Sequence, residues 1–177
     1  MALRIILQEP DERLRKTSRE VKEISPRIIQ LLDDMKETLT IAKGYGLAAP
    51  QVGVLRRIFI TDMCDGTGFK EFINPEIIFA EGEQTGEEGC LSCGERRGVV
   101  TRPMHVICRA MNRDGQIVEH DATGLFARCI CHECAHLDGG LYIDLMEQEL
   151  APNEYYSEED GKVVTDEDDD IEVSEVE

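Results

Sequence analysis

The sequence lacks the long apolar runs that membrane spans and export signals require. Its longest runs, Ile58–Ile60 and Ile77–Ala80, are far shorter than the roughly 20 residues needed to cross a bilayer. Near the N-terminus the apolar stretch covers only residues 5–7, which is too short for a secretory signal, and three acidic residues within 9–12 are atypical of a transit peptide. We therefore expect a cytoplasmic protein that does not enter a membrane.

Basic residues are also scarce, with 19 Lys and Arg against 37 Asp and Glu, for a net charge of -18. Nucleic acid is excluded as a principal ligand, because phosphate binding needs clustered cations. The charge is unevenly distributed, since residues 157–177 hold 11 acids and one lysine. We expect one globular domain over residues 1–150 and an acidic, disordered, solubilising tail over residues 151–177.

Tryptophan is absent and aromatic residues make up only 5%, yet the 41% of hydrophobic residues is ordinary for a globular protein. The seven cysteines are an odd number in a chain without a visible export signal. A complete disulfide framework is therefore not expected, and reduced thiols or metal ligands are the better interpretation.

Local signals predict two helices separated by short strands. Ser25 and Pro26 begin the first helix, which Gly44 terminates, and residues 44–53 are expected to form a loop. The second helix is expected to begin near Thr123 and to end before Gly139. Strands are expected at residues 57–61, 71–73, 76–80, 98–101, 105–111 and 116–120, the last two forming a hairpin around residues 112–115. This order predicts an α+β fold with antiparallel sheets.

The second helix carries the sequence His132-Glu133-Cys134-Ala135-His136. Residues four apart lie about 40° apart around a helix, so the two histidines can bind one metal, and Glu133 can reach a water beside it. A short pattern of this kind also occurs by chance, and two histidines on an ordinary helix remain the alternative.

Two histidines leave a tetrahedral ion short of a third protein ligand. Cys131 and Cys134 point away from the histidine pair, whereas Cys129 lies about 40° from the midpoint of the pair and is possible either as a ligand or as a wall of the pocket. Cys90, which follows a glycine between polar segments, is the better donor. A buried structural thiol is the usual role of a free cysteine, so the residues alone leave this choice open.

Three segments in this order resemble the signature motifs of peptide deformylases: GYGLAAPQVG at 44–53, EEGCLS at 87–92 and CHECAHLDGGLYID at 131–144. The likeness extends from about Leu3 to Met146. It implies antiparallel sheets packed around a C-terminal HExxH helix, with an additional N-terminal helix. It also implies a metallohydrolase that removes the N-formyl group from the N-terminal methionine of newly synthesised polypeptides, releases formate and associates transiently with ribosomes.

The resemblance also implies residue roles. Cys90 is expected to be the third metal ligand beside His132 and His136, with Fe(II) as the common ion and Zn, Ni or Co as possible occupants. The expected catalytic residues are Glu133 as the acid and base, Gln51 and the Leu91 N–H as oxyanion donors, and Gly46 in the cleft. The expected substrate-binding residues are Gly44, Tyr45, Glu88, Arg97, Leu125, Arg128 and Cys129.

The chain departs from the family pattern beside its histidines and after its cysteine motif. Cys131 and Ala135 stand where Gln and Asp are usual, and Cys93-Gly94 replace an aliphatic residue and proline. Such changes next to ligands can cost about 10- to 100-fold in activity or metal affinity. Arg128 stands where the family generally places an aliphatic residue of the methionine pocket. A surface arginine is the favoured interpretation, and the alternative hypothesis is that Arg128 narrows or polarises this pocket.

Three other functions are compatible with parts of the sequence. A non-catalytic zinc module could use the CxxC pairs at 90–93 and 131–134. An HExxH peptidase would need a downstream third ligand, such as Asp144 or Glu147. A degenerate relative could bind formylated chains without turnover.

Overall fold

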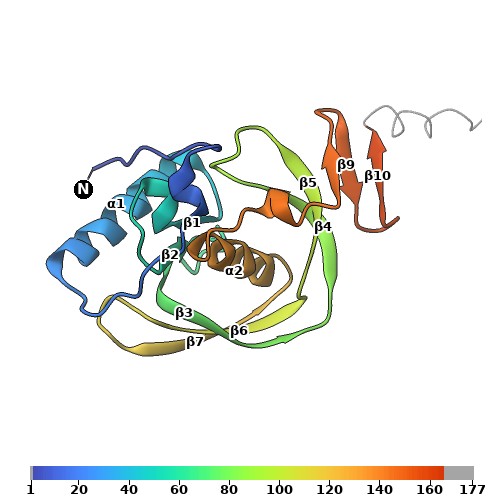
Figure 1. The fold of residues 1–177 in the computed structure, drawn as a ribbon. Helices are drawn as coiled ribbons and strands as arrows, with labels where there is room; N and C mark the ends of the chain where they lie inside the picture. The colour runs from blue at the N-terminus through green and yellow to red at the C-terminus, as the bar shows by residue number, and fades with distance from the viewer. Residues whose placement is uncertain (1, 166–177) are drawn as a thin grey trace, which may run out of the picture.

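The structure is a computed structural model, and it describes residues 2–165. Within them the fold is α+β, as expected, with every strand-to-strand pairing inside the sheets antiparallel (Figure 1). The helices are α1 (Pro26–Ala42) and α2 (Gly124–Leu137), with 3-10 helices η1 (Glu12–Arg15), η2 (Ala49–Val52) and η3 (Tyr142–Asp144). The strands are β1 (Gly46–Ala48), β2 (Ile58–Thr61), β3 (Lys70–Glu81), β4 (Gln84–Gly89), β5 (Arg97–Arg102), β6 (His105–Met111), β7 (Ile117–Thr123), β8 (Gln148–Leu150), β9 (Glu154–Ser157) and β10 (Lys162–Thr165).

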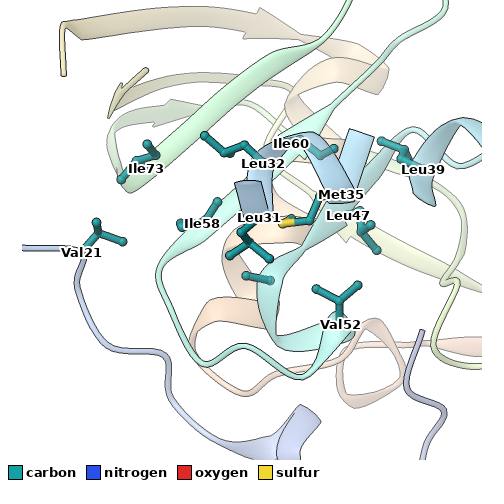
Figure 2. Close-up of a cluster of buried hydrophobic side chains, with 11 residues drawn as sticks. Val21, Leu31, Leu32, Met35, Leu39, Leu47, Val52, Ile58, Ile60 and Ile73 are labelled. Carbon is teal, nitrogen blue, oxygen red and sulfur yellow. The ribbon is translucent and has the colours of Figure 1, made fainter. Parts of the chain in front are cut away.

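Helix α1 covers one part of the largest sheet, whose strand order is β1-β2-β3-β6-β7. Its apolar face packs on strands β1 and β2, where Leu31 and Met35 lie among Leu47, Ile58 and Ile60 (Figure 2). Pro at the first helical position confirms the predicted start. The helix ends one residue earlier than the glycine suggested, because Lys43 itself adopts the left-handed conformation at the C-cap, with φ 56°.

Residues 44–53 are more regular than the expected loop. Strand β1 pairs with β2 in the register Gly46↔Thr61, and η2 follows it directly. The prediction of an irregular loop was therefore wrong for residues 46–52. Burial explains the difference, since Leu47, Ala48 and Ala49 are fully buried and their backbone groups need partners there.

Helix α2 lies centrally in the molecule, against the large sheet (Figure 1). Ala127 and Ile130 on its buried face pack on Phe59, Phe72 and Val106. The predicted start after Thr123 is confirmed. This packing fixes the helix by one face and leaves its histidine face turned toward the smaller sheet.

The smaller sheet has the order β4-β5-β8 and leads directly into the cysteine motif. Strand β4 was not predicted from sequence, and the two runs expected at 71–73 and 76–80 form one continuous strand, β3, with a register shift near Asn74. The predicted hairpin at 105–120 is confirmed as β6 and β7, closed by a turn in which the Gly115 N–H donates to Asn112 O at 3.0 Å.

The acidic C-terminal segment begins with regular structure. Strands β9 and β10 pair in the register Ser157↔Lys162. The expectation of disorder was therefore wrong for residues 154–165, and residues 166–177 lie outside the described residues. Within residues 2–165, no helix combines the length and apolar character that a bilayer span requires.

Candidate metal centre

Helix α2 places His132 and His136 side by side, with ring centroids 4.9 Å apart. Cys90 follows strand β4, and its Sγ lies 3.3 Å from His136 Nε2. One donor atom from each of the three residues lies within 4.8 Å of the other two. Burial lowers the pKa of His136 well below its usual range, so this ring is neutral, as metal binding requires. One sulfur and two imidazole nitrogens thus form a compact donor set that fits one divalent ion.

A buried carboxylate, Glu88, orients His132. Its Oε2 lies 3.0 Å from His132 Nδ1, which leaves Nε2 of that ring available to a metal. Glu88 also accepts hydrogen bonds from Arg102 at 2.9 and 3.0 Å and from Arg128 at 2.9 Å. Burial alone would raise the pKa of Glu88, but the hydrogen bonds with His132 and Arg102 lower it to about 2. Glu88 is therefore a carboxylate at neutral pH. Its hydrogen bond to Nδ1 fixes the orientation of the His132 ring.

Glu133 lies on the same helix face, 3% exposed, and burial raises the pKa of its carboxyl to about 7. Its Oε2 has no hydrogen-bond partner in the structure. Gly46 makes room for it, because a Cβ at that position would lie 2.3 Å from Glu133 Oε1. A buried carboxyl that titrates near neutrality beside the donor set is suited to moving a proton.

The side chain of Gln51 is held toward the cysteine motif from η2. Its Oε1 accepts a hydrogen bond from the Ala48 N–H at 2.8 Å, which fixes the amide orientation. Its Nε2 donates to Ser92 Oγ at 3.1 Å and lies 3.5 Å from Cys90 Sγ. An amide donor is thereby positioned next to the donor set before any ligand binds.

The family model for polypeptide deformylase matches residues 3–151. The chain belongs to the peptide deformylase family. It is accordingly a metal-dependent hydrolase, and the three-residue donor set agrees with this class.

Individual relatives cover most of the chain. The peptide deformylase of Agathobacter rectalis is 53% identical over 150 residues, which are 85% of this chain and 94% of the relative. Peptide deformylase 1 of Clostridium acetobutylicum is 49% identical over 144 residues, covering 81% and 95%. Among solved structures, the peptide deformylase from Legionella pneumophila has a TM-score of 0.80 and 39% identity, covering 85% of this chain and 88% of that one. The enzyme from Thermotoga maritima has a TM-score of 0.80 and 34% identity, covering 83% and 99%.

The structure does not assemble the metal sites that a zinc module or an HExxH peptidase would need. Cys131 and Cys134 pack in the core around Phe59 and Phe72, whereas Cys90 and Cys93 belong to a different cluster. The four sulfurs therefore do not assemble a zinc module.

The downstream carboxylates that a peptidase would need are engaged elsewhere. Asp144 pairs with Arg15, and Glu147 accepts a hydrogen bond from Thr101. Within residues 2–165 the one group of three possible ligands is the upstream cysteine with the histidine pair.

A cleft of about 590 Å³ opens beside the donor set. Several residues expected from the family resemblance line it: Gly44, Tyr45, Gly46, Gln51, Cys90, Leu91, Arg97, Cys129, His132 and Glu133. Arg97 also ties the C-terminal segment to this region, since it donates to the carbonyls of Ala151, Pro152 and Glu154.

Three expected substrate-binding residues are not part of the cleft lining: Glu88, whose carboxylate contacts His132, and Leu125 and Arg128. Leu125 and Arg128 line a smaller pocket of about 380 Å³, together with Met104 and Glu158. Arg128 is only 5% exposed, so the interpretation as a surface arginine was wrong. Its guanidinium donates to Glu88 and to three backbone carbonyls, of Gln84, Gly86 and Val100.

Two residues at the site were not predicted. Arg102, on β5, donates to both carboxylate oxygens of Glu88, and Tyr142 stacks on His132 with ring centroids 6.0 Å apart. Tyr142 lies within the third segment that resembles the family, residues 131–144, and this position is a signal that could have predicted it. No local pattern marks Arg102, because its partner is brought to it by the pairing of β4 with β5.

Proposed function

We propose that the protein removes the formyl group from N-formylmethionyl peptides and releases formate. The observation that carries the proposal is the convergence of Cys90, His132 and His136 within 4.8 Å, with buried Glu133 beside them at an open cleft. Family membership supports formylated nascent chains as substrates. We also propose that the enzyme acts in the cytoplasm, in transient association with ribosomes, because formylated nascent chains are the proposed substrates.

We propose Fe(II) as the physiological ion, with Zn, Ni or Co able to occupy the same ligands. Three protein ligands would leave a coordination position open to water and substrate. When bound, such an ion acidifies water and polarises a carbonyl group. Thiolate and imidazole donors suit all four of these metals, so the donor set narrows the choice without deciding it.

Glu133 is the proposed acid and base. In the metal-free protein its pKa is about 7, so both protonation states are present at neutral pH. It takes a proton from the water that attacks the formyl carbon and delivers that proton to the leaving amine. The absence of a hydrogen-bond partner at Oε2 leaves this atom available to the attacking water.

Gln51 and the Leu91 N–H are the proposed oxyanion donors. The bond from Ala48 fixes the Gln51 amide in advance, so little reorganisation is needed when charge develops on the formyl oxygen. Gly44, Tyr45, Arg97 and Cys129 are proposed to contact the peptide along the cleft. The proposed role of Glu88 is to hold His132 in place.

Anaerobic purification with metal analysis, followed by measurement of formate release from formyl-Met peptides, tests the proposal. Glu133→Ala is expected to retain the metal and to lose turnover. Retained turnover in this variant would remove Glu133 from the mechanism, and a native metal-loaded protein that releases no formate would contradict the proposed activity.

A further inference from the structure

A tight turn joins Cys90 to a second cysteine that the proposed hydrolysis does not use. The Cys93 N–H donates to Cys90 O at 2.9 Å, which is the hydrogen bond of a four-residue β-turn. Such a turn places its first and last Cα atoms less than about 7 Å apart, and disulfides span about 4.4–6.8 Å between Cα atoms. The backbone therefore already holds the two residues near the separation that a disulfide needs.

The two side chains also share one environment. Both are buried, and both belong to the cluster that contains Val100, Leu141 and Tyr142. The turn itself forms part of the cleft wall, since Cys90 and Leu91 line the cleft, so a small oxidant can approach from there.

The sulfur atoms of Cys90 and Cys93 have different surroundings. Cys90 Sγ lies 3.3 Å from His136 Nε2, 3.4 Å from the Ser92 N and 3.5 Å from Gln51 Nε2, so it connects the metal ligands with the proposed oxyanion donor. Cys93 belongs to no group of metal-ligating atoms within residues 2–165. Cys93 is thus a thiol free to react beside one that is committed to the metal.

We propose that Cys90 and Cys93 form a reversible disulfide that releases the metal and protects the ligand thiol from irreversible oxidation. This inference rests on the proposed role of Cys90 as a metal ligand. The oxidant is a peroxide. Hydrogen peroxide transfers one oxygen to Cys93, giving a sulfenic acid and one water. The Cys90 thiolate then attacks the Cys93 sulfur, the S–S bond forms and hydroxide leaves, taking up a proton to become a second water.

In the disulfide state Cys90 carries no thiolate, so two histidines alone remain to hold an ion. Loss of one of three protein ligands releases the metal, and hydrolysis stops. Reduction by two electrons and two protons from a dithiol restores both thiols. In the absence of Cys93, a sulfenic acid formed on Cys90 would proceed to irreversible sulfinic and sulfonic acids.

The test uses the full-length Zn-loaded protein and hydrogen peroxide, with a chromophoric chelator reporting metal release. Peptide mapping identifies the oxidised residues, and intact mass reports the loss of two hydrogens. For the native chain we expect about one ion released per Cys90–Cys93 disulfide, and recovery of metal binding after dithiol and zinc are added. For Cys93→Ser we expect oxygen addition at Cys90 and no recovery.

Cys134→Ser is the matched control, because Cys108 and Cys134 are a second pair of cysteines packed together in one core cluster, away from the donor set. This variant is expected to release and recover zinc as the native chain does. The proposal is overturned if mapping finds no Cys90–Cys93 disulfide in the native chain, or if Cys93→Ser recovers equally well. Because these readouts need no formylated peptide, failure of the proposed activity would be seen separately.

Discussion

At the residue scale, Glu133 links folding to pH. Burial raises the pKa of its carboxyl from 4.5 to about 7 in the metal-free protein. Since the folded-state pKa is the higher one, folding favours the protonated form, and this stabilisation is complete below about pH 4.5 and lost as pH rises through about 7. Relative to Glu133→Gln, the native chain should lose about 3 kcal/mol of unfolding free energy across this range.

Urea unfolding of both metal-free proteins at a series of pH values measures this difference. The exposed residue Glu95 provides a control, and Glu95→Gln should follow the native pH profile. Parallel profiles for the native chain and Glu133→Gln would show that the carboxyl is not buried as described.

Gly46 sets the position of the same carboxylate. In Gly46→Ala the new methyl group would lie 2.3 Å from Glu133 Oε1, so the acid must move. A misplacement of about 1 Å can cost about 100-fold in rate, so we expect a loss of about 100-fold in kcat if Glu133 is the proposed acid and base. Steady-state kinetics and metal analysis should show reduced kcat with metal content unchanged.

Gly89→Ala is the control for this variant, because a Cβ there would meet its nearest atoms at the ordinary distance of 3.7 Å. Its kcat should fall much less than that of Gly46→Ala. Equal losses in the two variants would mean that the Gly46 effect does not act through Glu133.

Arg128 is the residue we expect to shift substrate preference. Its guanidinium lies outside the cleft and is bound to Glu88, so its effect on the substrate would pass through Cys129, the next residue on α2, which lines the cleft. In Arg128→Ile we expect the ratio of kcat/KM for formyl-Met peptides to that for formylated acidic peptides to rise by about tenfold, equivalent to about 1.4 kcal/mol. Competition assays with both peptides measure the ratio, and an unchanged ratio would exclude this role.

At the element scale, helix α1 ends with a strained cap. Lys43 adopts φ 56°, a left-handed conformation that favours glycine. Lys43→Gly should therefore raise the free energy of unfolding by about 0.5–1 kcal/mol. Ala42→Gly, at the last residue of the helix, should lower it by up to about 1 kcal/mol. Urea unfolding would contradict this interpretation if the two glycine variants changed stability in the same direction.

The predictability of each element followed from the range of its interactions. Helix α2 and the β6–β7 hairpin carry their own start and turn signals, and both were predicted. Strand β4 has the sequence QTGEEG, which is poor in β-branched and aromatic residues, and it forms because β5 supplies its partner. Strand β1 was likewise missed, since pairing with β2 makes its glycine-containing sequence extended.

At the scale of the whole molecule, the site joins three segments that are distant in sequence. The motifs indicated which residues belong to it, and the family resemblance supplied Cys90 as the ligand that local reasoning had left open. The contacts of Glu88 with His132, Arg102 and Arg128 could not be predicted from the motifs. Glu88 and Arg128 are 40 residues apart and meet only in the folded chain, where the Arg128 side chain reaches from α2 to strands β4 and β5. No local pattern encodes such a contact.

The most direct test of the account is X-ray absorption spectroscopy of the metal-loaded chain, with metal content determined on the same sample. We expect one ion per chain, ligated by one sulfur and two imidazole nitrogens, with the sulfur lost in Cys90→Ser and kept in Cys131→Ser. A site with four sulfurs, or one whose sulfur survives in Cys90→Ser, would contradict the proposed centre.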